Sequence, residues 1–122
     1  MKIIHEPTLS ACLAALTACE YACRFASDAC AADAKADLLG PCIRANRDCV
    51  DACVAAKAQL AIPGALEAAS ARLQACRRAC LECASECAAH ADDLPECGVA
   101  AAAARACAAA CERVESLGSP AT

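Results

Sequence analysis

The chain has 122 residues, a formal net charge of −4 and 14 cysteines, and its length suffices for one domain with one core. The acidic balance and the lack of a basic stripe argue against a nucleic-acid partner. There is no Trp, only one Phe, one Tyr and one Met, and most other apolar positions are alanine, which buries little area. Disulfides or a bound metal must therefore stabilise the interior.

The N-terminal segment is expected to be retained. The tetrapeptide LTAC that ends at Cys19 resembles a bacterial lipoprotein cleavage site, but Lys2 is the only Lys or Arg before it and Pro7 interrupts the segment. Cleavage there would also remove Cys12. We therefore expect a cytoplasmic protein, and we find no apolar run that is long enough to span a bilayer. A reducing cytosol disfavours structural disulfides and favours metal binding.

The first two predicted helices span about residues 8–33 and 36–60. Their cysteines follow steps of seven and four residues, which place them on one stripe of each helix. The stripe repeats after 30 residues, with Asn46 in place of Leu16. We expect this buried amide to fix the register of the helices. The cysteines concerned are Cys12, Cys19, Cys23 and Cys30, followed by Cys42, Cys49 and Cys53.

The third and fourth predicted helices span about residues 64–91 and 94–117, and the breakers Pro63, Gly64 and Pro95 mark their starts. In the third, CRRACLECASECAAH places four cysteines at steps of four, three and four, and a histidine continues the same face. The candidate ligands on these helices are Cys76, Cys80, Cys83, Cys87 and His90, followed by Cys97, Cys107 and Cys111.

Short connections make neighbouring helices antiparallel, so the sequence predicts an all-α, up-down-up-down antiparallel four-helix bundle with a cysteine-lined core, as one domain over residues 1–122. The two ends of such a bundle differ in chemistry. One end is expected to be open or polar and gathers Cys30, Cys42, Cys87, His90 and Cys97. Hydrocarbon is expected to close the other with Leu9, Leu60, Ile62, Leu66, Leu73 and Val114.

The spacing of the cysteines indicates a soft metal ion. Cβ atoms at positions i and i+4 of a helix lie about 5–6 Å apart, which is too wide for an unstrained disulfide but suits an ion between two thiolates. Zinc and iron–sulfur sites usually use C-x2-C spacings at turns, and only Cys80 and Cys83 have this spacing, inside a helix. Pairs of cysteines at many positions along the helices would give each metal ion few ligands, and this favours Cu(I). A zinc or iron–sulfur protein and a disulfide scaffold remain the alternatives; an enzyme is disfavoured because no base is poised beside a nucleophile.

C-x3-C pairs on four helices, the run C-x3-C-x2-C-x3-C and the following H-x4-P-E-C-G resemble the bacterial copper storage proteins over about residues 8–117. The resemblance implies a homotetramer of bundles, each holding many Cu(I) ions on its thiolates with His or Met near the open end. It also implies copper sequestration without catalysis, in the cytosolic branch, with exchange to a copper chaperone or chelator. Ala104 stands where many relatives carry cysteine, which implies a lower capacity. The expected ligands are the fourteen cysteines and His90.

Overall fold

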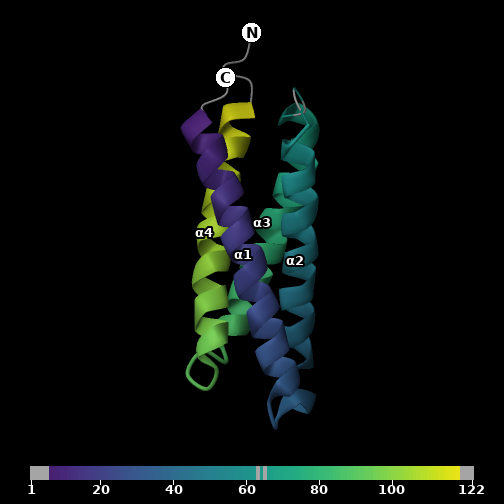
Figure 1. Ribbon diagram of the computed structural model, residues 1–122, viewed down its shortest axis with the longest axis vertical. Helices are drawn as coiled ribbons and strands as arrows, with labels where there is room; N and C mark the ends of the chain where they lie inside the picture. The colour runs from purple at the N-terminus through teal and green to yellow at the C-terminus, as the bar shows by residue number, and fades with distance from the viewer. Residues whose placement is uncertain (1–5, 63, 65, 119–122) are drawn as a thin grey trace.

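The computed structural model describes residues 6–62, 64 and 66–118, which form helices and turns without any strand. The helices are α1 (Glu6–Ala32), α2 (Gly40–Leu60), α3 (Leu66–Ala88) and α4 (Pro95–Gly118), and a short 3-10 turn, η1 (Ala36–Leu38), joins the first two. Each helix packs along its neighbours in sequence, and α4 packs against α1 to close the ring (Figure 1). The predicted all-α, up-down-up-down four-helix bundle is confirmed.

The helix ends depart from the prediction where the connections form turns of their own. α2 begins at Gly40, with Pro41 in its first turn, because η1 occupies the residues before it. α3 ends at Ala88 rather than at about residue 91. Beyond it the chain folds back, since the amides of Asp93 and Leu94 both donate to the carbonyl of His90, at 3.2 and 2.9 Å. His90 therefore lies in a turn and does not continue the helix.

By length and hydropathy, the segment Pro7–Ala32 could cross a membrane, so the expectation that no such run exists is wrong. In the structure this segment is α1, and its four cysteines are fully buried against the rest of the bundle. Its Glu20 accepts from Arg24 of the same helix at 3.0 Å and pairs with Lys57 of α2 at 2.5 Å. α1 thus has the buried stripe and the paired charges of a core helix in a bundle.

The apolar end of the bundle has fewer members than predicted. Leu73 and Val114 are each 1% exposed, and Leu16 is fully buried. Leu9 and Leu60 are only half-buried. Ile62 is 54% exposed, so its assignment to the apolar end is wrong; it follows α2 in the connection and points to solvent. Two other predicted features lie outside the described part of the chain, namely the side chain of Leu66 and the turn at Pro63.

The opposite end, expected to be open or polar, is covered by hydrocarbon. Leu39, in the connection between η1 and α2, is 5% exposed and belongs to the same buried cluster as the cysteines. Leu94, which precedes α4, packs against that cluster from the other connection. The cysteines of this end are fully buried. Both connections fold inward because each supplies one leucine that the alanine-rich helices do not provide.

Candidate metal centre

All fourteen cysteines lie inside the bundle with no solvent exposure, and none forms a disulfide. Their helical spacing turns each set toward the axis, so the four inward stripes meet there as a sulfur column. Large apolar side chains are rare along this axis, and alanines fill the gaps between the thiols. The sequence prediction that every cysteine faces the core is confirmed by their burial.

One end of the sulfur column, beside Leu39, is a group of three thiols that we call the end triad. Cys30 of α1, Cys42 of α2 and Cys97 of α4 have Sγ–Sγ distances of 3.6 to 3.9 Å. Cys87 of α3 extends this group toward the middle, with its Sγ 3.8 Å from that of Cys42. Three helices therefore supply one site, and their connections bring the thiols together.

The middle of the column holds two groups of four thiols and one of three, and within each group all the sulfurs lie within 4.8 Å of one another. Representative Sγ–Sγ distances are 3.5 Å for Cys19 and Cys49, 3.6 Å for Cys49 and Cys80, and 3.8 Å for Cys53 and Cys76. Such separations let one ion contact several sulfurs, because a zinc–sulfur bond of about 2.3 Å gives a tetrahedral edge of about 3.8 Å. The groups are Cys19, Cys49, Cys53 and Cys80; Cys53, Cys76, Cys80 and Cys107; and Cys23, Cys49 and Cys83.

Asn46 is a fully buried amide among these thiols. Its Nδ2 donates to the carbonyl oxygen of Cys42 at 2.8 Å and to the Sγ of Cys87 at 3.2 Å, while its Oδ1 accepts from Cys83 at 3.3 Å. One side chain thus links the end triad with the middle groups. The sequence indicated that Asn46 faces the stripe. The bond to Cys42 lies within α2, whereas the contacts with Cys83 and Cys87 depend on the approach of α3.

The thiols at the end triad hold their protons strongly. Burial, followed by hydrogen bonding with Cys97, raises the pKa of Cys30 to about 11. Burial also raises the pKa of Cys42 and of Cys97. Deeper in the column, hydrogen bonds from Cys107 and Cys111 lower the pKa of Cys76 to about 5. Since adjacent thiols exchange hydrogen bonds in a dry core, they cannot all be charged at once without a counter-ion.

We expect the metal-free, reduced bundle to lose stability in alkali. The ordinary pKa of the Cys30 thiol is 9.0 and its folded value is about 11. A raised pKa favours the protonated folded state, so its contribution is complete below pH 9 and disappears as the pH rises through 11. Thermal melting followed by circular dichroism should show a falling melting temperature across this interval. A constant melting temperature would contradict the protonated core, and a Cys30→Ala variant should show a smaller fall.

His90 does not join any sulfur group. Its side chain is half-buried and lines a cavity of about 320 Å³, together with Leu39, Leu94 and the charged residues Asp33, Lys35 and Asp93. Among the described residues, no group of ligating atoms within 4.8 Å includes it. His90 therefore does not continue the helical stripe as expected, because α3 ends two residues earlier and His90 lies in the turn that follows. Its role as a ligand stays a prediction. His90 lies beside Leu39 and Leu94, the two leucines at this end of the column.

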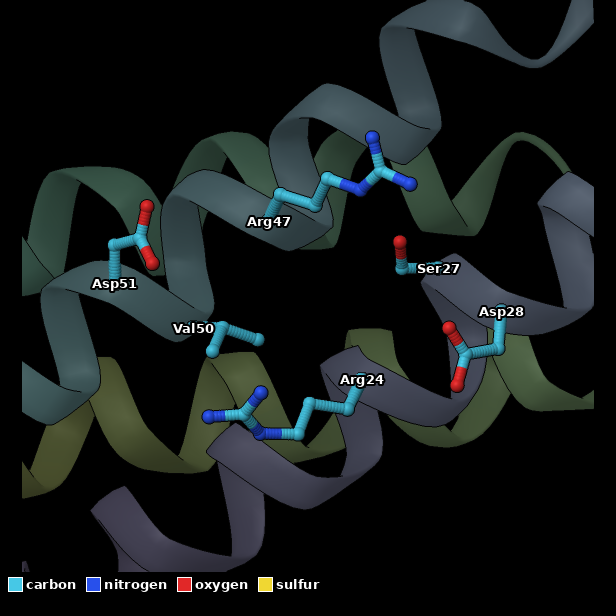
Figure 2. Close-up of a pocket in the computed structure, with 6 residues that line it drawn as sticks. All are labelled: Arg24, Ser27, Asp28, Arg47, Val50 and Asp51. Carbon is cyan, nitrogen blue, oxygen red and sulfur yellow. The ribbon is translucent and has the colours of Figure 1, made fainter.

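A second cavity, also of about 320 Å³, lies on the outside of the bundle between α1 and α2. Figure 2 shows that Arg24 and Arg47 face it together with Asp28 and Asp51, so its opposite charges balance. No thiol lines this cavity. It is therefore separate from the sulfur column and offers no soft ligand for a metal.

Comparison with known proteins agrees with the chemistry of the column. Residues 5–116 match the family model described as copper storage protein, Csp. No curated protein matches the chain significantly. The copper storage protein Ccsp from Streptomyces lividans, in a structure loaded with 10 copper equivalents, is 34% identical with a TM-score of 0.86, covering 90% of this chain and 85% of that one.

Two further structures from Streptomyces lividans are similar over nearly their whole length. One is a cytosolic copper storage protein with five coppers, 33% identical with a TM-score of 0.86, covering 94% of this chain and 96% of that one. The other is a Ccsp variant with two histidines replaced by alanine, 32% identical with a TM-score of 0.89, covering 93% and 98%. With a family match over most of its length and a bundle lined by fourteen thiols, this chain belongs to the copper storage protein family.

Proposed function

We propose that this copper storage protein holds many copper ions as Cu(I) on the thiolates of the sulfur column. The observation that supports this most is the continuity of the column, in which Sγ atoms from all four helices stand 3.5 to 4.0 Å apart. Soft thiolates select Cu(I), which forms stable complexes with two or three ligands. The end triad and the group of Cys23, Cys49 and Cys83 each offer three.

The charge balance of the core favours a monovalent ion. In the described part of the chain the only buried polar or charged residues are Glu20, Ser27 and Asn46, so no cationic side chain is present to neutralise thiolates. One Cu(I) for each thiolate leaves the column neutral, whereas a divalent ion held by four thiolates leaves two excess negative charges. Uncompensated charge in a dry core is costly. The same argument supports a filling of close to one copper per cysteine.

The ligands in this proposal are the fourteen cysteines. His90 receives or releases copper at the end of the column, since it lies outside Leu39 and outside every sulfur group. The family has a storage role, and we propose that the chain has no catalytic activity, because the column contains no base apart from the thiols themselves. A copper chaperone or chelator would exchange copper with it at the His90 end.

The test of this function is an anaerobic titration of the reduced protein with Cu(I) against a strong chromophoric chelator. We expect on the order of one Cu(I) per cysteine, since thiolates can bridge neighbouring ions. A Cys→Ser variant at an interior position should lose about one ion, and a variant of the exposed Leu81 should lose none. Saturation at one or two Cu(I) would contradict the proposed store.

We further propose a cytoplasmic homotetramer. The cytoplasmic location is supported by the similarity to a Streptomyces lividans protein described as cytosolic. Assembly is supported by large apolar side chains on the outer surface of α1 and α4, where Tyr21, Phe25 and Val99 are 57 to 68% exposed. Light scattering should give the mass of four chains, and Phe25→Glu should lower it. A monomeric mass for the unmodified protein would rule out the tetramer.

A further inference from the structure

Two of the sulfur groups are not independent, because they have two thiols in common. Cys53 of α2 and Cys80 of α3 belong to both four-sulfur groups. The remaining members lie in pairs on either side of them. Together these thiols form what we call the central six-thiol group: Cys53 and Cys80 in the middle, Cys19 and Cys49 on one side, and Cys76 and Cys107 on the other.

The distances inside the central six-thiol group fit two tetrahedra that share an edge. A tetrahedral site with metal–sulfur bonds of about 2.3 Å requires sulfur separations of about 3.8 Å. The Sγ of Cys80 lies 4.0 Å from that of Cys19, 3.6 Å from that of Cys49 and 3.9 Å from that of Cys76. Cys53 and Cys76 are 3.8 Å apart. Little movement is needed to place an ion in each half.

We propose that the copper-free chain binds two divalent ions of the zinc and cadmium class here, as a thiolate-bridged pair. Cys19 and Cys49 hold one ion, Cys76 and Cys107 hold the other, and Cys53 and Cys80 bridge the two. Four-coordinate thiolate sites are those that Zn(II) prefers. Zinc sites built on loops use C-x2-C knuckles, but here the tetrahedra come from opposite helices, which is why the sequence spacing did not indicate them.

Charge explains both why the pair forms and why copper removes it. Two divalent ions displace six thiol protons and leave a net charge of −2, whereas two separate four-thiolate sites would leave −4. Sharing two sulfurs therefore lowers the cost of burial. At the end triad only three sulfurs lie within 4.8 Å of one another, and Cys87 is not among them, so this end offers no preformed tetrahedron of cysteines. Because Cu(I) leaves the same thiolates neutral, we expect it to displace both divalent ions.

The test uses Co(II), whose visible bands and paramagnetism report tetrahedral thiolate sites, added anaerobically to the reduced full chain. We expect the bands to saturate at two Co(II) per chain. Thiolate bridges couple the two spins, so most of the EPR intensity per cobalt should disappear at saturation. Cd(II) and Cu(I) should each then bleach the cobalt bands. Saturation at a different number, or a full EPR signal at two Co(II), would overturn the proposal.

Matched variants separate the bridging thiols from the rest of the column. Cys80→Ser and Cys53→Ser should each abolish the spin coupling and the second cobalt, and circular dichroism should show retained helix. Cys30 and Cys12 lie outside the group, so Cys30→Ser and Cys12→Ser should change neither the spin coupling nor the number of bound Co(II) ions. Loss of coupling in Cys30→Ser, or its retention in Cys80→Ser, would contradict the assignment. The inference depends only on these thiols. If the chain failed the Cu(I) titration but still bound a coupled pair of Co(II) ions, the proposed copper storage would be wrong and the proposed divalent pair would stand.

Discussion

Replacing Leu39 by alanine should accelerate the transfer of Cu(I) between the protein and an external chelator. Leu39 is 5% exposed and belongs to the buried cluster at the end where we propose that copper enters and leaves. On that proposal, the side chain must move aside before an ion can pass. Exposing a leucine side chain costs about 1.5–3 kcal/mol, and removing that cost corresponds to a rate increase of about 10- to 100-fold. Stopped-flow absorbance with a chromophoric chelator measures the rate directly.

The chain offers a matched control for this prediction. Leu38 is the adjacent residue but is 74% exposed, so Leu38→Ala should leave the rate unchanged. Leu60→Ser, at the other end, should also have little effect, since Leu73 and Val114, each 1% exposed, still close that end. His90→Ala should slow the transfer without altering total capacity. Equal rates for Leu39→Ala and Leu38→Ala, or a large acceleration in Leu60→Ser, would place the route at the opposite end.

A second large effect is expected for Leu73→Ala on the stability of the metal-free bundle. Leu73 is 1% exposed and is one of very few large apolar side chains in a core made mostly of alanine and cysteine. Truncating a buried leucine costs about 2–5 kcal/mol, which is a large share of a typical domain stability of about 5–15 kcal/mol. Urea unfolding followed by circular dichroism measures this loss.

Leu81 of the same helix provides the comparison, because it is 53% exposed. Leu81→Ala should change the free energy of unfolding by no more than about 0.5 kcal/mol. Copper should raise the stability of both variants, since ligands that bind only the folded state stabilise it. If Leu73→Ala were as stable as Leu81→Ala without metal, the sulfur column alone would carry the stability of the fold.

Much of the fold was encoded locally in the sequence. The helical steps between cysteines, with Pro41, Gly64 and Pro95 near the connections, predicted the helices and their antiparallel order. Periodicity determines which face of a helix is buried, so the inward position of every cysteine could be predicted as well. The helix ends were less predictable, because η1 and the turn after Ala88 depend on backbone hydrogen bonds that no periodic pattern records.

Other features depended on how the helices meet. The sequence presented thiols as C-x3-C pairs such as Cys76 and Cys80, whereas the structure groups them across helices, with Cys53 and Cys80 in two groups at once. The sequence also left one end open, and only the inward fold of the connections placed Leu39 over it and His90 outside. The spacing of cysteines along one helix determines which way each thiol points, but it does not determine which thiol of another helix lies opposite. The sequence thus determined that this chain is a bundle lined with sulfur, and packing between helices decided which sulfurs lie together.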